Sequence, residues 1–483
     1  MTETDQHAEI AMKNERSPIT HYPLLMTVGS AILFFLLATL RHALFKSNAY
    51  DLGWYDQYIY LISQGLPPIV SFRGPQTFHL LGDHVAIICY PLALLYKIYA
   101  TVHWLFALQA IALAGSCWLV WLLSRQSGLK ETDATMMAAV YLLYPLIFNV
   151  NIYDFHPEVL AIPGMLGAVW AARERKYIWF CSAIALILSC KAVLSLTVAA
   201  MGFWLFFFEK RLRCGAIALL SGSMWFIGTT QWIIPQFLGM EQTSVSRYGY
   251  LGDSVLEIAL NLFLKPDLVW GHIFSLATLE YLALLFLPVF WGLSARHFAP
   301  FIPALPALLL NILSQEYAQR NLVRHYSVPI FPFIILALIA ARSANSAWIR
   351  DRRVILAWSL CGFLVLGKYY FFGKVYLDSL DTWQANREAI ALIQRRGLVS
   401  KPSPVLAPSQ LIPHLSHREI IRIPSPETPL DTLQQFKYIL LDRRHPGFAS
   451  STETVMGLIA ALDKNTRFER IYQRDEVFLY QRH

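Results

Sequence analysis

Apolar runs of helical length alternate with short polar breaks along most of the chain, up to about residue 374. The hydrocarbon core of a membrane is about 30 Å thick, so roughly 20 helical residues cross it, and backbone left unpaired inside it is costly. The pattern therefore predicts about eleven membrane-spanning helices. We place them at 24–41, 105–123, 134–151, 158–172, 177–190, 192–208, 215–235, 275–294, 299–314, 326–341 and 354–372.

The run at 85–101 is apolar but short, and it carries Pro91 and Lys97. We predict that it forms a helix at the membrane surface, beside a second surface helix at 54–64 whose aromatic and polar side chains fall on opposite faces. Five groups of basic residues then fall on the side of the amino terminus, in the breaks that hold Arg125 and Lys130, Arg173 to Lys176, Lys210 to Arg213, Arg296, and Arg342 to Arg353. This agrees with the positive-inside rule, so the amino terminus is predicted to be cytoplasmic.

Hydrophobic runs shorten to strand length after residue 375 and alternate with helical stretches, which predicts a small soluble α/β domain. Its predicted helices are 381–396 and 452–462, and its predicted strands are 405–407, 419–423, 438–442, 468–473 and 477–480, the last two forming an antiparallel hairpin. The predicted organisation is a cytoplasmic tail at 1–22, a transmembrane domain at 23–374 with an outer loop at 42–104, and an extracytoplasmic domain at 375–483.

The composition agrees with an α-helical polytopic membrane protein, because 56% of the residues are hydrophobic and only 15% are charged. The net charge of +8 could suggest a nucleic-acid partner. The lysines and arginines lie in short loops beside apolar runs rather than in one patch, however, so no nucleic acid is predicted. The positive charge instead indicates how the chain is oriented across the membrane.

Carboxylates and imidazoles gather in the polar breaks on the predicted outer face. A one-sided cluster of this kind suits acid–base chemistry, and we expect catalytic residues among them. Asp51 and Asp154 could instead be simple caps of the helices that follow them, whereas His156 has no comparably simple structural role. The candidates are Asp51, Asp56, His84, Asp154, His156 and Glu158.

A divalent cation, Mg²⁺ or Mn²⁺, is one alternative use of these oxygen and imidazole groups. No pair of histidines at helical spacing defines a metal geometry, so no cofactor is predicted as required. Basic residues on the same face form a second set, in which an arginine can hold phosphate oxygens bidentately and a lysine near a helix end can merely reach the headgroups. The candidates for binding a substrate phosphate are Lys191, Arg247, Arg320, Arg324 and His325.

Several motifs carry a resemblance to a family of predicted bacterial membrane proteins, a domain of unknown function. They are Tyr50-Asp51-Leu52-Gly53 with Asp56-Gln57, Gly82-Asp83-His84, Asn151-Ile152-Tyr153-Asp154-Phe155-His156-Pro157-Glu158 and His414-Leu415-Ser416-His417-Arg418. The layout of an aspartate after the first span, an outer loop and an outer carboxy-terminal domain also resembles the GT-C superfamily of lipid-phosphate-dependent glycosyltransferases.

The superfamily resemblance implies transfer of a sugar from a polyprenyl-phosphate carrier to a cell-envelope acceptor, outside the bacterial plasma (inner) membrane. It implies that Asp51, with Asp56 second, acts as the general base or helps to hold a metal. The chain departs from these resemblances at two places. Leu52 follows Asp51 where many superfamily members have a second acidic residue. Ala192 and Val193 follow Lys191 where the family of predicted membrane proteins has an acidic residue soon after the lysine.

Two other functions stay open at the level of sequence. A transporter or lipid flippase would use ionisable groups near the membrane midplane, commonly within internal repeats, and neither feature is evident here. A non-catalytic membrane scaffold whose outer domain binds a partner is the third reading.

Overall fold

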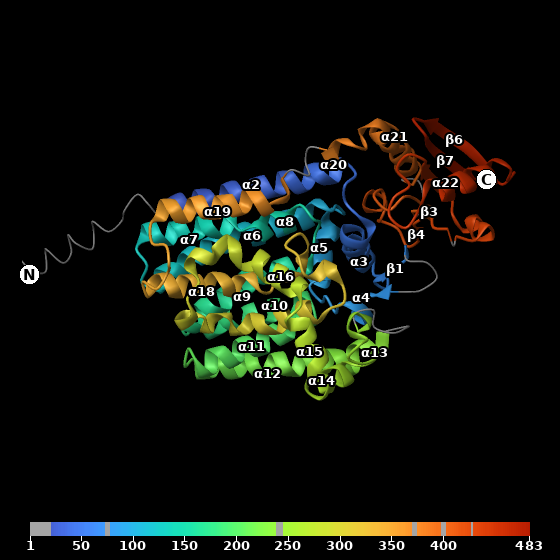
Figure 1. The fold of residues 1–483 in the computed structure, drawn as a ribbon. Coiled ribbons are helices and arrows are strands. Elements are labelled where there is room, and N and C mark those ends of the chain that lie inside the picture. The colour runs from blue at the N-terminus through green and yellow to red at the C-terminus, as the bar shows by residue number, and fades with distance from the viewer. Residues whose placement is uncertain (1–20, 73–77, 238–244, 370–373, 398–401, 427) are drawn as a thin grey trace, which may run out of the picture.

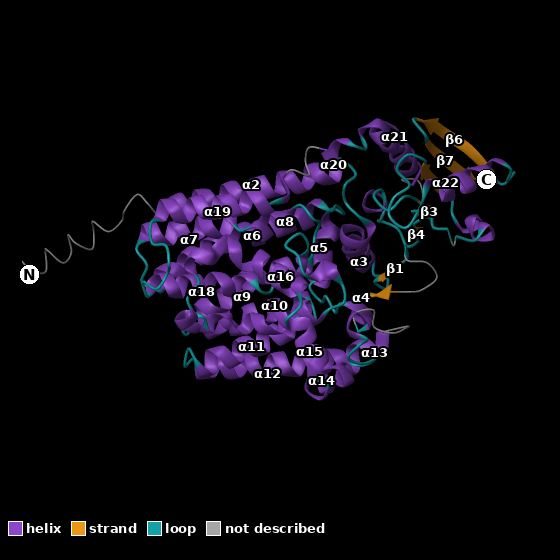
Figure 2. Cartoon of the chain, viewed as in Figure 1, coloured by secondary structure: helices purple, strands orange, loops and turns teal. Residues whose placement is uncertain are grey.

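The computed structural model describes residues 21–483 except 73–77, 238–244, 370–373, 398–401 and 427. Most of this chain forms a bundle of helices lying side by side, and an α/β region with a small sheet sits at one end of the bundle (Figures 1 and 2). The helices α3, α4 and α5 lie at this same end, whereas α2 begins at the opposite end. The predicted cytoplasmic tail falls almost wholly outside the described residues.

The helical bundle is built by the segments up to Leu366. Its α-helices are α2 (His21–Ala43), α3 (Trp54–Ser63), α4 (Leu80–Asp83), α5 (Cys89–Ile98), α6 (His103–Gln126), α7 (Glu131–Leu143), α8 (Pro145–Asn151), α9 (Pro157–Arg173), α10 (Tyr177–Cys190), α11 (Leu194–Phe207), α12 (Leu212–Gly228), α13 (Ile234–Phe237), α14 (Val255–Leu264), α15 (Pro266–Ile273), α16 (Leu276–Phe286), α17 (Leu305–Leu313), α18 (Phe331–Ser343) and α19 (Arg352–Leu366). A short π-helix, η2 (Ala49–Gly53), precedes α3, and a 3₁₀ turn, η9 (His325–Ser327), precedes α18. Two short strands, β1 (Ile69–Val70) and β2 (Phe78–His79), pair antiparallel in the segment between α3 and α4.

Fewer helices have spanning length than the apolar runs predict. Among the described residues, three are long and apolar enough to cross a membrane, or five if two bent pairs each count as one span. The predicted helix 134–151 is really α7 and α8, which meet at 48° where Pro145 cannot donate to the preceding turn. Shorter apolar helices account for several other predicted spans, so the count of eleven stays a prediction.

The helices α11 and α12 touch through their backbones because glycines line the contact. A Cβ atom at Gly222 would lie 2.5 Å from Ala199 N and 2.7 Å from Ser195 O, and one at Gly215 would lie 2.6 Å from Phe206 N. Small residues let neighbouring membrane helices approach in this way.

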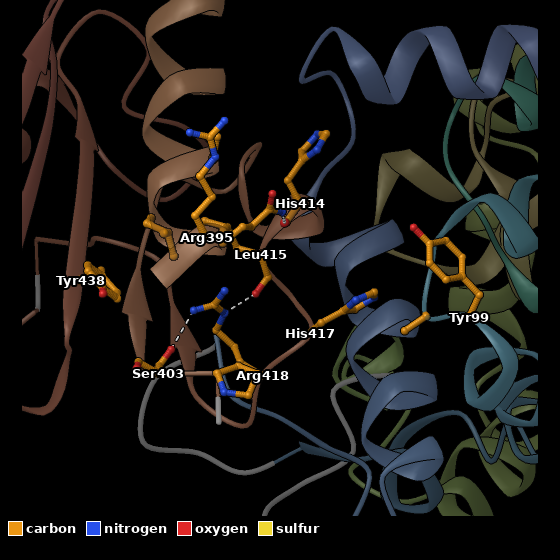
Figure 3. A pocket seen from close by; sticks show the side chains of 13 residues that line it. Tyr99, Arg395, Ser403, His414, Leu415, His417, Arg418 and Tyr438 are labelled. Carbon is orange, nitrogen blue, oxygen red and sulfur yellow. Dashed lines mark hydrogen bonds between the residues drawn. The ribbon is translucent and has the colours of Figure 1, made fainter. Parts of the chain in front are cut away.

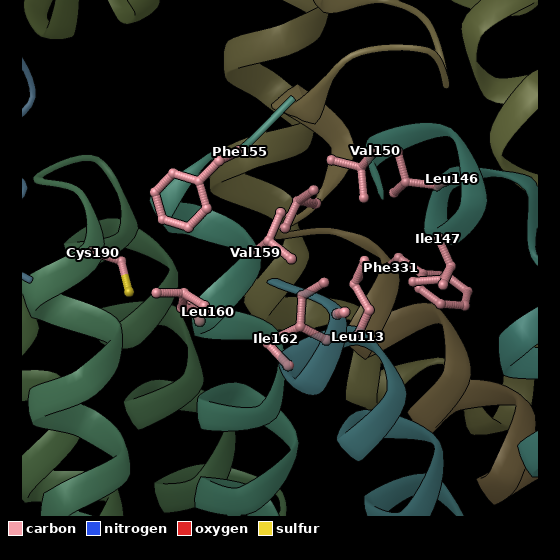
Figure 4. Packing of buried hydrophobic residues seen from close by; sticks show 14 of the residues in the cluster. Leu113, Leu146, Ile147, Val150, Phe155, Val159, Leu160, Ile162, Cys190 and Phe331 are labelled. Carbon is pink, nitrogen blue, oxygen red and sulfur yellow. The ribbon is translucent and has the colours of Figure 1, made fainter. Parts of the chain in front are cut away.

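The interior of the bundle packs around the start of α9. Phe155 and Val159 lie against Leu113 of α6, Val150 of α8 and Phe331 of α18 in one buried cluster (Figure 4). Close-packed apolar side chains resist displacement. This packing therefore limits movement of the polar turn just before α9.

The C-terminal α/β region contains α20 (Lys374–Leu377), α21 (Leu380–Gly397), α22 (Thr452–Asp463) and a five-stranded sheet in the order β4-β3-β5-β7-β6. The strands are β3 (Val405–Leu406), β4 (Ile421–Arg422), β5 (Tyr438–Asp442), β6 (Phe468–Arg474) and β7 (Val477–Arg482). β3 pairs parallel with β4 and β5, while β7 pairs antiparallel with β5 and β6, which confirms the predicted hairpin. The predicted domain boundary at residue 375 stays a prediction.

Alternation along β5 places the two faces of the sheet in different cores. Leu440 joins the core that is continuous with the bundle, whereas Ile439 and Leu441 join a separate core with α22. Successive side chains of a strand point to opposite faces, so both faces here are covered. The region is further joined to α2, where His414 stacks on His42 with ring centroids 3.8 Å apart and Trp383 Nε1 donates to Ala43 O at 2.8 Å.

The helix predicted at 54–64 forms as α3, but most of its side chains are buried within the protein, on the polar face as well as on the aromatic one. Its location at the membrane surface stays a prediction. Asp56 and Gln57 of α3 are fully buried, and Gln57 Nε2 donates to Arg418 O at 2.9 Å. The C-terminal region thus bonds to the buried polar side chains of this helix, together with Ser71 and Tyr96.

Replacing Gly222 by alanine is expected to destabilise the protein by about 1–3 kcal/mol, since the new methyl group would force α11 and α12 apart. Gly115→Ala in α6 is the control: no atom outside its own helix lies within 4 Å of the added Cβ. That variant should be neutral or gain about 0.5–1 kcal/mol. Thermal unfolding of both purified proteins in detergent measures the difference, and equal midpoints would contradict this account.

Candidate functional site

The turn between α8 and α9 is held by a buried ion pair. The Asp154 carboxylate accepts a hydrogen bond from Arg41 at the end of α2 and another from the N–H of Asn48 at 3.0 Å. Asn48 Oδ1 in turn accepts the N–H of Tyr50 at 3.2 Å, which caps η2, the short helix that carries Asp51. Asp154 thus positions the segment on which Asp51 lies.

Gln109 of α6 fixes the same turn from the other side. Its Nε2 donates to Asp154 O at 3.3 Å, and its Oε1 accepts the N–H of His156 at 3.2 Å. These contacts accompany an uncommon backbone conformation, since Asp154 has a φ of 147°. A non-glycine residue keeps such a φ only where its surroundings determine it strongly.

Four separate segments bring their polar side chains together beside this turn. His156 Nε2 lies 3.3 Å from Asp51 Oδ1, and the rings of His156 and His325 stack with centroids 3.9 Å apart. His325 Nε2 lies 3.4 Å from Glu158 Oε1, which also accepts a hydrogen bond from Lys191 Nζ at 2.8 Å. We call these five residues the Asp51–Lys191 cluster.

The members of the cluster differ in exposure. The Asp51 side chain is 17% exposed, whereas that of His156 is 3% exposed. Burial lowers the pKa of His325 well below its usual value, and His156 and Lys191 beside it lower that pKa further. His325 is therefore neutral near pH 7. Of the two carboxylates in the cluster, Asp51 is more exposed than Glu158 and is better placed to contact a molecule that enters from solvent.

Two of the predicted phosphate-binding arginines lie against the aromatic side chains around the cluster. The Arg247 guanidinium is 5.6 Å from the ring centre of Tyr326, and that of Arg324 is 5.9 Å from the ring centre of Tyr153. Arg320 instead donates to Ile312 O at 3.4 Å, and the described contacts do not bring it to the cluster.

His84 lies at the edge of the cluster. Its ring is 6.4 Å from that of Tyr55, which is 6.1 Å from that of His156. The backbone carbonyl of His84 accepts the N–H of Ala192 at 2.9 Å and so joins the outer loop to the segment after Lys191.

Asp56 serves a different contact. Its carboxylate accepts hydrogen bonds from Tyr96 Oη at 2.5 Å and from Ser416 Oγ, and His417 Nε2 lies 3.2 Å from it. It thereby links α3 and α5 to the C-terminal region, and the structure does not bring it to the Asp51–Lys191 cluster.

The predicted alternative of a divalent cation does not fit this geometry. Among the described residues, no group of three or more His, Cys, Asp or Glu side chains is arranged to hold a metal ion. Of the carboxylates named for it, Asp154 is paired with Arg41 and Glu158 with Lys191, and Asp51 lies beside His156.

Sequence reasoning missed Arg41 and Gln109. Both are polar residues at or inside long apolar helices, where an unpartnered polar group is costly. A polar residue at such a position was therefore the feature of the sequence that could have indicated both residues.

The family model described as "Predicted membrane protein (DUF2079)" matches residues 41–479. The chain belongs to this family. No curated protein matches this DUF2079 family member. Its chain is similar to the crystal structure of ArnT from Cupriavidus metallidurans in the apo state, with a TM-score of 0.44, 12% identity and coverage of 96% of this chain and 98% of that one. It is also similar to ArnT from the same organism bound to undecaprenyl phosphate, with a TM-score of 0.41, 10% identity and coverage of 95% and 97%.

In this DUF2079 family member, Arg41→Met is expected to cost about 3–5 kcal/mol of stability, because it leaves Asp154 buried without its ion partner. Adding Asp154→Asn should recover much of that loss, since the unpaired charge disappears. Unfolding of the single and double variants measures the coupling. Arg443→Met is the control: its ion pair with Glu476 is solvent-accessible and should contribute about 0–1 kcal/mol. Strictly additive losses at Arg41 and Asp154 would contradict the pairing.

Proposed function

We propose that this protein is an integral membrane glycosyltransferase that moves a sugar from a polyprenyl-phosphate donor to an acceptor on the extracytoplasmic face. The observation that carries the proposal is the contact between Asp51, a partly exposed carboxylate, and the buried His156. The His156 imidazole limits the orientations of the Asp51 carboxylate. Because Asp51 is partly exposed, an acceptor hydroxyl can reach its carboxylate.

Asp51 would act as the general base. It accepts the proton of the acceptor hydroxyl as that oxygen bonds to the anomeric carbon, and the bond between this carbon and the phosphate oxygen breaks. The electron pair leaves with the polyprenyl phosphate, and attack from the opposite face inverts the anomeric centre. His156 orients Asp51, and Asp154 positions the backbone segment that carries it.

Departing phosphate needs positive charge nearby. Arg247 and Arg324 are the better candidates, because both lie against aromatic residues that flank the two stacked histidines and a guanidinium can hold two phosphate oxygens at once. Lys191 is bonded to Glu158 and would contribute a weaker field. The contact of Arg320 with Ile312 makes it the least favoured of the four.

The proposal places the Asp51–Lys191 cluster and the C-terminal region outside the plasma membrane of a bacterium, with the amino terminus inside. The helices α6, α9 and α18 begin near the cluster and carry Arg125, Arg173 and Arg342 in their last turns. Basic residues at those ends agree with a cytoplasmic location.

Asp51→Asn is expected to lower transfer at least about 100-fold, since an amide cannot accept the proton. The measurement is release of undecaprenyl phosphate or another free lipid phosphate from a panel of radiolabelled polyprenyl-phosphate sugars, with the purified protein in nanodiscs. Asp253→Asn, which changes an exposed outer-loop carboxylate, should keep the wild-type rate.

Equal release by wild type and Asp51→Asn would remove Asp51 from the mechanism. Transport of a labelled substrate into proteoliposomes without lipid-phosphate release would favour the transporter.

The orientation is tested with reporter fusions. Alkaline phosphatase fused after His483 is expected to be active in cells, because that enzyme matures only outside the cytoplasm, and the same enzyme fused before Met1 should be inactive. A reversed pattern would contradict the proposed location of the cluster.

A further inference from the structure

A cavity of about 570 Å³ lies between the end of α5 and the C-terminal α/β region, away from the Asp51–Lys191 cluster (Figure 3). This volume is within the usual range for sites that bind small molecules or headgroups. The residues that matter for its chemistry are Tyr99, Arg395, Ser403, His414, His417 and Arg418.

The cavity is cationic. Arg395 reaches it from the last turn of α21 and Arg418 from the loop before β4, and none of the described residues that line it is Asp or Glu. Burial lowers the pKa of His414 to about 4, so this imidazole is neutral at pH 7. The positive charge therefore comes from the two guanidinium groups, beside an imidazole, His417, that contacts Asp56.

The wall that carries Arg418 is rigid. Arg418 Nη1 donates to Ser403 O at 2.7 Å and its Nε donates to Leu415 O, as Figure 3 shows. A guanidinium has five N–H donors, so this anchoring is compatible with further donation to a ligand. His417 is also held, since its ring stacks on Tyr60 with centroids 4.8 Å apart.

The mouth of the cavity adjoins an apolar surface. Tyr99 lines the cavity and is 70% exposed, and Ile98 just before it is 77% exposed. An exposed apolar helix end of this kind suits the membrane interface, where tyrosine rings accommodate both lipid and water. A cationic cavity beside such a surface suits a ligand with an anionic head and an apolar tail.

We propose that this cavity binds a phosphate-bearing anion, with Arg395 and Arg418 as its ligands. A phosphate monoester offers several strong acceptor oxygens and up to two negative charges, which match a cavity lined by two arginines and, among its described residues, by no carboxylate. The source is either the headgroup of an anionic lipid or a free phosphate. The inference does not depend on the proposed sugar transfer, because it concerns binding alone.

Calorimetric titration of the purified full chain tests the inference. The probes are inorganic phosphate, short-chain phosphatidic acid below its micelle concentration, and the zwitterionic short-chain phosphatidylcholine. Wild type is expected to bind the phosphatidic acid, and Arg395→Gln should weaken that binding about fivefold by removing one charge-assisted hydrogen bond. Arg387→Gln changes an exposed arginine on the same helix, outside the cavity, and should bind as wild type does.

Binding of phosphatidic acid alone assigns the cavity to a lipid headgroup, and binding of inorganic phosphate as well assigns it to phosphate from either source. The proposal is overturned if neither anion binds, if phosphatidylcholine binds equally well, or if Arg395→Gln binds as tightly as wild type. Arg395 is exposed, so its variant tests the cavity even if Arg418→Gln fails to fold.

Discussion

The pairing of Arg41 with Asp154 is the contact on which the arrangement of the candidate site depends. The Asp154 side chain is 1% exposed and that of Arg41 is 13% exposed, and a buried charge left alone costs several kcal/mol, so the end of α2 and the turn before α9 stay together. The same carboxylate holds the Asn48 N–H, and the next polar link caps the short helix of Asp51. The position of Asp51 thus follows from a charge, that of Asp154, which is itself not accessible.

A second buried carboxylate organises the end of the bundle that adjoins the C-terminal region. Asp56 receives donors from α5 and from the C-terminal region, so it joins three parts of the chain at one point. The approach is close enough that a Cβ atom at Gly53 would lie 3.2 Å from Ile412. Asp51 of the Asp51–Lys191 cluster lies on η2, and Asp56 and Tyr60 of the following helix α3 contact His417, which lines the cationic cavity.

The carboxylates show which contacts reasoning from the sequence can anticipate and which it cannot. Asp51, His156, Glu158, Lys191 and His325 were predicted to act together, and the structure brings them within contact of one another. Asp56 and Asp154 were predicted to belong with them as catalytic groups. Asp154 instead contacts Arg41 and Asp56 contacts His417, and the catalytic role of both stays a prediction. The sequence could not separate these carboxylates from Asp51, because Arg41 and His417 are far from Asp154 and Asp56 along the chain.

The sequence by itself determined the membrane class, the helical character of the bundle and the positions of the C-terminal strands and helices. Each of these follows from composition or from a periodicity that is read within ten or twenty residues. The tertiary structure decided which polar groups meet, where apolar runs break, and that the polar face of α3 is covered by protein. Such pairings join residues as distant as Asp56 and His417, 361 positions apart, and no local pattern encodes a contact that only folding brings about.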